Sequence, residues 1–552
     1  MSLPGQVLVA DLVGRAIADL GAAHAFGVVG SGNFAVTNAL VAAGVPFVAA
    51  RHEGGAATMA DAYARTSGRV AVVSVHQGCG LTNAMTGITE AAKSRTPLVV
   101  LAADVAGSAV GSNFRIDQDT LVRSVGAVPE RVHSAGSALE DVRRAYRTAA
   151  HGRRTVVLNV PLDVQAAEVD EPGRLEPLPA AGRMAPETSV TDVLATLLGG
   201  AERPVFLAGR GAMAYGRELA ALADRVGALL TTSGVAAGTF ADEAYDLGIC
   251  GGFATPLAAE LVTAADLVVA WGCSLTSWTT RHGRLLGART TLVQVDDDPA
   301  AIGGRRPVDL GIAGDVGLTV AAVADRVAGR ELRVGFRTPD VARRIRAEGR
   351  WPQVPYNDLS TESTIDPRTL SSRLDALLPG NRQLAVDSGN FMGYPAGYLA
   401  VPAAGAFCFT QSFQSIGLGL ATAIGSALAV PDRLSVLGTG DGGFLMGIAE
   451  LETAVRVGLG LLVVVYDDAA YGAEVHHFGP DGADLTTVRF PDTDLAAIAR
   501  GFGAEGVIVR SPEDLHPVEA WLAGPRQRPL VIDAKISSDG GSWWLQEAFR
   551  AH

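Results

Sequence analysis

Glycine and aspartate residues gather at a place where the chain could bind a phosphate and a metal ion. The run GTGDGGF (438–444) follows an apolar segment and precedes a helical pattern. A glycine-rich turn lets backbone N–H groups approach a phosphate, and the amino end of the next helix favours negative charge. Asp441 lies in this turn, and Asp468 ends the next apolar segment. Mg²⁺ prefers oxygen ligands that bridge to phosphates, so the pair predicts a magnesium and phosphate site; a tight turn beside a polar loop is the alternative.

A glutamate at the start of a predicted helix is the second candidate. Glu53 lies in RHEGGAATMADAYAR (51–65), directly after the apolar segment VPFVAA (45–50). Taken alone, a glutamate in a first helical turn can simply complement the helix dipole. The segment continues, however, with YAR at 63–65 and with the pattern G-x-G-x-T-N at 78–83.

These segments resemble the thiamine diphosphate enzymes of the acetolactate synthase and pyruvate decarboxylase group. Residues 51–103 follow the pattern of the pyrimidine-binding domain of that group almost continuously. The resemblance implies that Glu53 hydrogen-bonds ring nitrogen N1′ of the aminopyrimidine, which helps the cofactor lose its C2 proton. The cofactor would supply the carbon chemistry, and the protein would supply position and electrostatics.

The same resemblance implies the ligands of the metal ion. GDG at 440–442, followed by Asp467-Asp468, resembles the metal-binding motif of the family in spacing. Asp441, Asp468 and the backbone carbonyl of Ala470 would then bind Mg²⁺. The family usually has Asn-Asn where this chain has Asp-Asp. A second carboxylate should tighten Mg²⁺ but repel the diphosphate of the cofactor.

Further contacts to the cofactor are expected from the third part of the chain. The segment TQSFQSIGLGL (410–420) resembles the one that holds the bent cofactor in the family. Ile416 would prop that bend, and the carbonyl of Gln414 would face the 4′-amino group; an ordinary core isoleucine is the alternative. The other expected cofactor-binding residues are Gly389, Asn390, Gly440, Gly442, Gly443, Tyr471 and Gly472.

Residues of the substrate pocket are expected in two segments. His76 and Gln77 stand where many acetolactate synthases have GPG, and they could face a substrate carbonyl or carboxylate. Glu474 stands where the pyruvate decarboxylase type carries an acidic proton donor, and His476 and His477 follow it. A neutral histidine or a glutamate could protonate the product of decarboxylation. We predict catalytic roles for Glu53, Gln77 and Glu474, with the three histidines near the substrate; a polar surface loop is the alternative for Glu474 and its neighbours.

Apolar segments rich in Val, Ile and Leu alternate with Ala-rich helical patterns along the whole chain. This alternation is typical of parallel sheets covered on both faces. A chain of 552 residues is too long for one core, and two stretches without periodicity, 166–190 and 350–366, are interpreted as linkers. We predict an α/β protein with three doubly wound domains: a pyrimidine-binding domain at 1–168, a central domain at 190–345 and a diphosphate-binding domain at 360–545. The resemblance implies a thiamine diphosphate-binding fold for the first and third and a Rossmann-like fold for the central domain.

Composition excludes several classes of function. The net charge is −13 and no basic run occurs, which argues against binding nucleic acid or an anionic membrane. The cysteines are scattered and suggest neither a zinc site nor disulfides. The first residues form an amphipathic pattern interrupted by Asp11, Arg15 and Asp19, unlike a signal peptide. A cytoplasmic location is therefore expected.

The function expected from these features is the decarboxylation of a 2-oxo acid with ligation to a carbonyl acceptor, dependent on thiamine diphosphate and Mg²⁺. A decarboxylase without ligation and a catalytically silent family member are the alternatives. A nucleotide-dependent oxidoreductase is disfavoured because G-x-G-x-x-G with a later acidic residue is missing. FAD is not favoured either, because GCSLTSWTTRHG (272–283) departs from the arginine-containing segment of acetolactate synthases. In the family, the two parts of the site meet between subunits, so a homodimer or homotetramer is expected.

Overall fold

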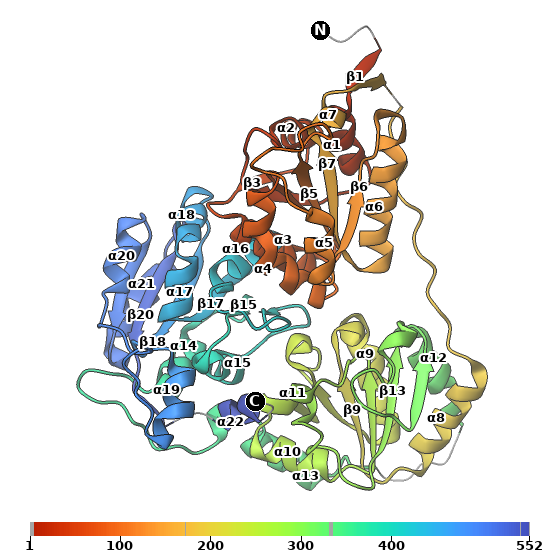
Figure 1. Ribbon diagram of the computed structural model, residues 1–552. Coiled ribbons are helices and arrows are strands. Elements are labelled where there is room, and N and C mark those ends of the chain that lie inside the picture. Colours follow the sequence, from red (N-terminus) through yellow and green to blue (C-terminus); the bar gives the residue numbers. More distant parts are fainter. Residues whose placement is uncertain (1–4, 172, 330–334, 541–542, 551–552) are drawn as a thin grey trace.

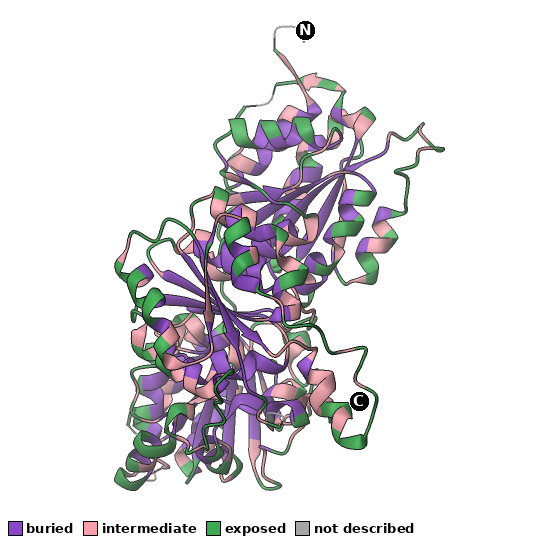
Figure 2. Ribbon diagram, turned by 90° about the vertical axis from the view of Figure 1, so that its left-hand side faces the viewer, coloured by how far each residue is buried: buried purple, intermediate pink, exposed green. Residues whose placement is uncertain are grey.

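Apolar segments form three six-stranded sheets in which all neighbouring strands are parallel (Figure 1). The computed structural model describes residues 5–171, 173–329, 335–540 and 543–550. Alternate residues of a strand in the first sheet face different hydrophobic cores: Leu98 and Val100 face one core, and Val99 and Leu101 face the other. Figure 2 shows such strands buried between layers of helices. The prediction of three α/β domains with parallel sheets is confirmed.

The first domain has the sheet order β3-β2-β4-β5-β7-β6. Its strands are β2 (His24–Gly27), β3 (Phe47–Ala49), β4 (Ala71–Val75), β5 (Leu98–Asp104), β6 (Val128–Arg131) and β7 (Thr155–Pro161). Its helices are α1 (Val9–Asp19), α2 (Phe34–Ala42), α3 (Glu53–Ser67), α4 (Cys79–Lys93), α5 (Gln118–Ser124), η1 (Ala135–Ser137), α6 (Ala138–Gly152) and α7 (Leu162–Gln165). An antiparallel pair, β1 (Gln6–Leu8) with β8 (Glu168–Asp170), joins its two ends.

The central domain has the sheet order β11-β10-β9-β12-β13-β14. Its strands are β9 (Pro204–Ala208), β10 (Leu229–Thr232), β11 (Asp246–Ile249), β12 (Leu267–Trp271), β13 (Thr291–Asp296) and β14 (Leu310–Ala313). Its helices are α8 (Thr188–Gly200), η2 (Arg210–Tyr215), α9 (Gly216–Val226), η3 (Gly234–Ala236), η4 (Gly251–Phe253), α10 (Pro256–Thr263), α11 (Ser277–Thr280), η5 (Pro299–Ala301), α12 (Val316–Val327) and α13 (Pro339–Glu348). This strand order is that of a doubly wound nucleotide-binding fold.

The third domain has the sheet order β16-β15-β17-β18-β20-β19. Its strands are β15 (Arg382–Val386), β16 (Phe407–Phe409), β17 (Leu434–Gly440), β18 (Leu461–Asp467), β19 (Glu505–Val509) and β20 (Leu530–Lys535). Its helices, with the short one that precedes them, are η6 (Trp351–Gln353), α14 (Pro367–Leu377), η7 (Asn390–Met392), α15 (Gly393–Tyr398), α16 (Gly419–Ala429), α17 (Asp441–Gly447), α18 (Ala449–Arg456), α19 (Gly472–Phe478), η8 (Gly479–Asp481), α20 (Leu495–Gly501), η9 (Pro512–Leu515), α21 (His516–Ala523) and α22 (Trp543–Phe549). The order of strands along the chain is the same as in the first domain, so these two domains share a topology that no sequence repeat reveals.

The first and third domains pack against each other through α3 and α16, which lie side by side (Figure 1). One hydrophobic core continues from the first sheet through these helices to the third sheet, and it contains Met59 of α3 and Ile424 of α16. A Cβ on Gly425 would overlap the carbonyl oxygen of Met59. Glycine at this position therefore lets the two helix backbones come close together, and the two domains form one packed unit.

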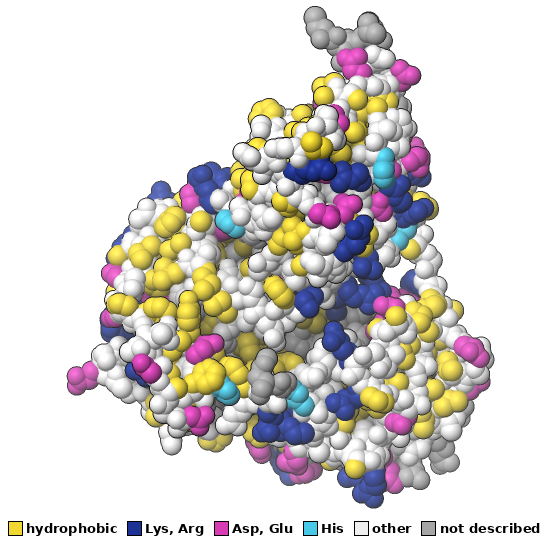
Figure 3. Space-filling model, in the orientation of Figure 1, with side chains coloured by type: hydrophobic (Ala, Val, Ile, Leu, Met, Phe, Trp, Pro, Cys, Tyr) yellow, Lys and Arg dark blue, Asp and Glu magenta, His cyan; other side chains and the backbone are white. Residues whose placement is uncertain are grey.

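Large hydrophobic side chains are exposed on loops of the first and third domains. Figure 3 shows hydrophobic side chains gathered over the third domain on the face that it presents. The exposed residues on loops and helix ends at or near the carboxyl edges of these two sheets are Val29, Phe34, Phe114, Ile116, Phe413, Leu445 and Met446. Among the residues that the structure describes, no helix is long and apolar enough to span a bilayer.

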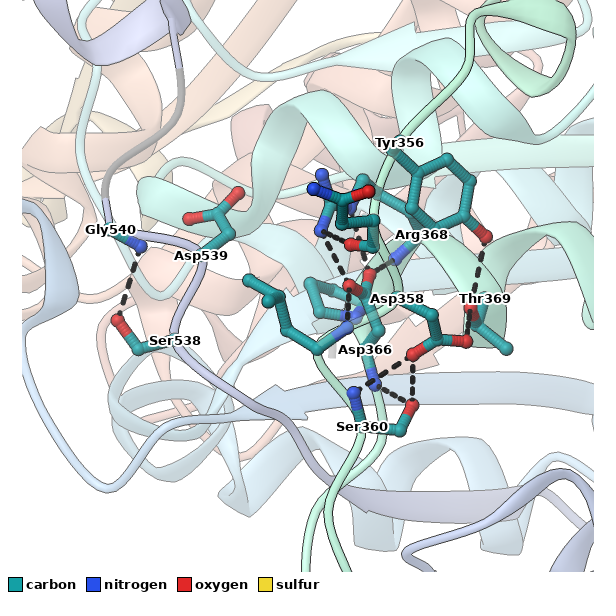
Figure 4. Close-up of polar contacts among 12 residues, drawn as sticks. Tyr356, Asp358, Ser360, Asp366, Arg368, Thr369, Ser538, Asp539 and Gly540 are labelled. Atoms are coloured by element: carbon teal, nitrogen blue, oxygen red, sulfur yellow. Dashed lines mark hydrogen bonds and ion pairs between the residues drawn. The ribbon is translucent and has the colours of Figure 1, made fainter.

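The two stretches interpreted as linkers differ in how they are held. Residues 173–187 contain neither helix nor strand and run along the outside of the molecule toward the central domain (Figure 1). The second stretch lies against the third domain (Figure 4), where Arg368 binds Asp366 and stacks on the ring of Tyr356 at 4.5 Å. The hydroxyl of Tyr356 also hydrogen-bonds Thr369 Oγ1 at 2.9 Å. The later part of the second linker is thus fixed to the third domain, while its first residues bind the central domain through Arg350 and Asp246. The domain boundaries stay a prediction.

Candidate active site

Three turns of the third domain meet at one edge of its sheet. β15, β17 and β18 are neighbours in the parallel sheet, so their carboxyl ends lie together. The turns that follow them carry the residues expected to bind the diphosphate and the metal ion. In open α/β sheets, ligands bind outside this edge.

Close packing brings the predicted residues of these turns together. A Cβ on Gly472 would overlap Asp468 Oδ2 and would lie 3.2 Å from Asn390 Nδ2. A Cβ on Gly442 would lie 2.8 Å from the ring of Tyr471. Two of the predicted glycines are therefore required by space, and they form a cradle beside Asp468.

Burial and neighbouring carboxylates make both aspartates of the predicted metal site harder to ionise. Asp441 is the first residue of α17 and only 7% of it is exposed. Burial, together with the charge of Asp467, raises the pKa of Asp441 to about 7. Burial and the charges of Asp441 and Asp467 raise the pKa of Asp468 to about 8. A divalent cation bound between Asp441 and Asp468 would remove this repulsion, so the donors fit Mg²⁺.

The third expected metal ligand is a backbone carbonyl whose neighbours are fixed. Ala469 has a left-handed φ of 50°, which costs energy for a residue other than glycine. Hydrogen bonds from Phe490 N to Ala469 O (2.8 Å) and from Tyr471 N to Val488 O (2.9 Å) hold the chain on both sides of Ala470. In the described part of the chain, no group of three or more His, Cys, Asp or Glu side chains is arranged to hold a metal ion. The predicted magnesium site uses only two side chains, Asp441 and Asp468, with a backbone carbonyl as the third ligand.

The segment that carries Gln414 and Ile416 is held at both ends. On one side, Glu90 of α4 accepts hydrogen bonds from Ser412 N (3.1 Å) and Phe413 N (2.7 Å). Gln414 has a left-handed φ of 65°. Ile416 is half-buried rather than part of a core. A strained backbone with firm anchors is typical of a binding site.

On the other side, the segment is anchored by Asp387 at the end of β15. The Asp387 carboxylate is fully buried and accepts hydrogen bonds from Gly417 N (3.1 Å) and Thr439 Oγ1 (3.2 Å). Burial raises the pKa of Asp387 to about 6, although its hydrogen bonds work in the opposite direction. Asp387 thus ties three elements of the third domain together.

Glu53 begins α3 at the carboxyl edge of the first sheet. The side chain of His52 caps the helix by accepting a hydrogen bond from Gly54 N (3.0 Å). Asn83 Nδ2 donates to Glu53 Oε2 at 3.1 Å, and a Cβ on Gly80 would lie 3.5 Å from Glu53 Oε1. Gly80 and Asn83 belong to the pattern G-x-G-x-T-N, so this pattern packs around the predicted catalytic glutamate.

His76 and Gln77 follow β4 beside this glutamate but have different environments. His76 Nε2 lies 3.5 Å from Ser31 Oγ, and its ring packs against Phe114. A Cβ on Gly80 would lie 3.0 Å from the Cβ of His76. Gln77 is buried against the loop after β2, and its Oε1 has no hydrogen-bond partner among the described residues. Gly80 therefore lies between His76 and Glu53.

The predicted residues of α19 lie beside the C-terminal helix. His477 stacks on Phe549 of α22 with ring centroids 4.0 Å apart. His476 is half-buried, and burial lowers its pKa despite the opposing charge of Asp539. Glu474 is half-buried on the same helix. Packing against α22 accounts for His477, which leaves Glu474 and His476 as the candidates for proton transfer.

Sequence reasoning missed several residues that support these predicted ones. Asn83 and Asp387 had a local signal, because each lies in a segment that already resembled the family. Ser31 and Glu90 had none, since their partners are distant in the sequence. α22 was also missed, although Trp544 Nε1 donates to the carbonyl of Asn390 at 2.7 Å.

The two half-sites stay apart within one chain. Within the described residues, no hydrogen bond joins Glu53 to the turn at Asp441. Instead, Arg51 N and His52 N both donate to Glu450 Oε1, which lies on α18, the helix after the one that Asp441 begins.

Family models match all three domains of the chain. The model described as "Thiamine pyrophosphate enzyme, N-terminal TPP binding domain" matches residues 8–122. The model of the central domain of these enzymes matches residues 191–323. The model of their C-terminal TPP binding domain matches residues 387–534. Thiamine pyrophosphate is another name for thiamine diphosphate.

Curated relatives align along almost the whole chain. A probable 2-ketoarginine decarboxylase of Pseudomonas aeruginosa is 30% identical over 94% of this chain and 91% of its own length. A putative acetolactate synthase large subunit of Mycobacterium tuberculosis is 30% identical over 90% of this chain and 92% of its own length. A sulfoacetaldehyde acetyltransferase of Castellaniella defragrans is 28% identical, covering 93% and 89%. The chain belongs to the thiamine pyrophosphate-dependent enzymes, in the group of the acetolactate synthases and related 2-oxo acid decarboxylases.

Proposed function

We propose that this enzyme decarboxylates a 2-oxo acid and joins the remaining acyl group to a carbonyl acceptor, with thiamine diphosphate and Mg²⁺. The observation that carries the proposal is the pair of half-sites at equivalent sheet edges: Glu53 held by Asn83 in the first domain, and Asp441 with Asp468 in the third. When bound, the cofactor would supply a nucleophilic carbon and an electron sink for the loss of CO₂.

The third domain would hold the anionic end of the cofactor. Asp441, Asp468 and the carbonyl of Ala470 would bind Mg²⁺. Backbone N–H groups of the glycine turn would face the diphosphate, because the glycines let a ligand come close to the backbone. The remaining residues assigned to cofactor binding are Gly389, Asn390, Gly440, Gly442, Gly443, Tyr471 and Gly472.

The first domain would hold the aromatic ring of the cofactor. Glu53 would share a proton with N1′ of that ring, and Asn83 would orient its carboxylate. Ile416 and the carbonyl of Gln414 would support the cofactor from the third domain. His76, with Ser31 at 3.5 Å, would orient the carbonyl group of the substrate.

Decarboxylation without ligation is the second candidate, and α19 is the observation that favours it. Glu474 and His476 both lie on this helix, half-buried. His476 is held neutral more readily than a free histidine because burial lowers its pKa. Either side chain could give a proton to the product before an acceptor arrives. The names of the relatives include a decarboxylase, an acetyltransferase and an acetolactate synthase.

We also propose that the enzyme works as a homodimer or a dimer of dimers. Exposed hydrophobic residues lie on both half-sites, for example Phe114 on the first domain and Met446 on the third. Met446 adjoins the Ile416 segment, because a Cβ on Gly417 would lie 2.8 Å from the Cβ of Met446. Exposed apolar surface beside a site commonly marks an interface, so a second copy would complete each site.

FAD stays disfavoured as a further cofactor. At the switch point of the central sheet, a dinucleotide would lie between the turns after β9 and β12. In this chain the two turns contact each other: Gly211 N donates to Gly272 O at 3.2 Å, and a Cβ on Gly209 would overlap that same oxygen. This contact supports the prediction, and a flavin absorption spectrum of the purified protein would test it.

The test is a panel of 2-oxo acids with and without aldehyde and ketone acceptors, in which CO₂ release and product mass are followed together. We expect CO₂ release that needs both thiamine diphosphate and Mg²⁺, and a product that contains acceptor carbon. An aldehyde as the only product would establish the second candidate. Cofactor binding without consumption of any 2-oxo acid would contradict both and leave a silent family member.

A further inference from the structure

The two aspartates that replace the usual Asn-Asn pair have different partners: one oxygen of Asp467 accepts a hydrogen bond from Ala469 N at 2.9 Å, and its other oxygen binds Lys535. Asp468 Oδ2 lies against Gly472 and close to Asn390, within the predicted metal site. Asp467 is buried, and its Oδ2 accepts a hydrogen bond from Lys535 Nζ of β20 at 2.6 Å. The carboxylates of these two consecutive residues therefore contact different parts of the third domain.

Lys535 is an unusual residue in this chain, because Lys93 and Lys535 are its only lysines. Its register partner in the sheet is Asp467, and only 8% of its side chain is exposed. The ammonium also contacts Asp533 Oδ2 (3.2 Å) and Asp492 Oδ1 (2.6 Å). Hydrogen bonds to these carboxylates, acting against burial, raise the pKa of Lys535. A buried ammonium with such partners stays charged.

The positive charge of Lys535 offsets part of the negative charge that the Asp-Asp pair adds to the predicted metal site. Asp441, Asp467 and Asp468 would place three carboxylates at the edge expected to receive an anionic diphosphate. Like charges about 4 Å apart repel each other by about 1 kcal/mol in water and by more where they are buried. One fixed cation paired with Asp467 lowers the net negative charge and also keeps that carboxylate turned away.

We propose that Lys535 is a positioning residue of the metal site: it neutralises Asp467 and holds it toward β20, so that Asp441 and Asp468 alone face Mg²⁺ and the diphosphate. The Asp467–Lys535 pair is then a charged replacement for the neutral asparagine that the family usually has. This inference rests on the proposed magnesium site.

A set of matched variants tests the pair. Lys535→Met leaves Asp467 uncompensated, Asp467→Asn with Lys535→Met restores a neutral pair, and Asp492→Asn removes a carboxylate that lies at the same 2.6 Å distance from the ammonium but has 68% of its side chain exposed. The dissociation constants of thiamine diphosphate at saturating Mg²⁺, and of Mg²⁺ at saturating thiamine diphosphate, are measured by quenching of tryptophan fluorescence.

We expect Lys535→Met to weaken thiamine diphosphate binding about tenfold, which corresponds to ~1.4 kcal/mol. The double variant should recover most of that loss, and Asp492→Asn should bind like the wild type. A merely structural role of Lys535 would not give this recovery, because the double variant is also without the ammonium. A double variant that binds as weakly as Lys535→Met would overturn the proposal.

Lys535→Met leaves Asp533 buried without its cation, so this variant could fail to fold. In that case Asp467→Asn alone is compared with Asp492→Asn, with thermal unfolding as the check of integrity. We expect Asp467→Asn to weaken Mg²⁺ binding several-fold, because the variant loses one negative charge next to the predicted metal site while Lys535, with Asp492 and Asp533, remains. We expect Asp492→Asn to have no effect. Equal Mg²⁺ affinities of the two variants would contradict the proposal.

Wild-type protein separates this inference from the proposed function. If the wild type binds thiamine diphosphate without any divalent ion, the magnesium site itself is wrong. If the wild type requires Mg²⁺ but the double variant shows no recovery, only the assignment of Lys535 fails.

Discussion

Glu53 is a half-buried carboxylate at the start of α3, held by a hydrogen bond from Asn83. The Glu53→Gln variant keeps the shape of the side chain but cannot share a proton with the cofactor. We expect thiamine diphosphate to bind almost as tightly, while exchange of its C2 hydrogen slows about a hundredfold, the size of a lost general acid or base. Deuterium exchange followed by NMR measures the rate, with Glu505→Gln, an exposed glutamate, as control. An unchanged rate would remove Glu53 from this role.

The buried carboxylate of Asp387 lowers the stability of the folded third domain when it is ionised. Burial raises the pKa of Asp387 to about 6, above the ordinary value of 3.8. Between these two values the unfolded chain loses this proton while the folded protein keeps it, so the folded state becomes relatively less stable as the pH rises. The carboxylate nevertheless holds Gly417 and Thr439 in place.

This cost gives a pH dependence that can be measured. From pH 4 to pH 6, the contribution of Asp387 should lower the free energy of unfolding by about 3 kcal/mol, at ~1.4 kcal/mol for each unit of pKa. Asp387→Asn should lose this slope. Urea unfolding at several pH values compares the two proteins, and parallel pH profiles would show that Asp387 does not titrate as argued.

At the scale of residues, the sequence was informative wherever a ligand dictates the spacing of a motif. Glu53, Asp441 and Asp468 could be named because each belongs to a local pattern, although their roles stay predictions. Lys535, Glu90 and Ser31 could not be named, because each acts on a partner that only the folded chain brings near. Long-range charge pairs leave no local pattern.

At the scale of elements, α4 links the two half-sites of one chain. Its first turns carry Gly80 and Asn83 beside Glu53, and its last turns carry Glu90, which binds the backbone of residues 412–413. Arg65 of α3 lies 3.8 Å from Glu90 and donates to the carbonyl of Phe409. The segment with Ile416 therefore depends on two helices of the other domain.

Removing this anchor should loosen the segment. We expect Glu90→Ala to lower the free energy of unfolding by about 2 kcal/mol, since hydrogen-bond donors lose a charged acceptor, and to weaken thiamine diphosphate binding. Glu90→Gln keeps one oxygen acceptor and should lose less in both measurements. Chemical denaturation and cofactor titration of the three proteins test this order; a Glu90→Ala protein equal to wild type in both would refute it.

The contact between α3 and α16 gives a second prediction for elements. A Cβ on Gly425 would overlap the backbone of Met59, so Gly425→Ala must push the helices apart. We expect a loss of about 2 to 3 kcal/mol in the free energy of unfolding, as for other overpacked sites. Gly200→Ala is the control, because nothing lies within 4 Å of a Cβ there. Similar melting temperatures for the two variants would show that the interface yields without strain.

Most elements could be anticipated from hydrophobic segments, because strands buried on both faces need continuous apolar residues. The terminal pair of β1 and β8 could not, since its strands are short and pair across the whole first domain. The attachment of the second linker to the third domain could not be predicted from the sequence either. It depends on Arg368 meeting Tyr356 and Asp366, a contact that composition does not encode.

At the scale of the whole molecule, the first and third domains have one topology and present equivalent sheet edges. Their sequences show no repeat, because many different apolar residues can fill the same buried positions. Within a chain the two domains pack through α3 and α16. The edges themselves carry exposed residues such as Phe114 and Met446, and we propose that a second chain covers them.

The central claim is that each thiamine diphosphate is held between two chains. The most direct measurement is the activity of a heterodimer that contains one Glu53→Gln chain and one Asp441→Ala chain, purified with two different tags. If the site is shared, one site of this heterodimer carries both substitutions and the other carries neither, so we expect about half the wild-type activity where both homodimers are inactive. A heterodimer as inactive as the homodimers would contradict the account, because each chain would then build its own site.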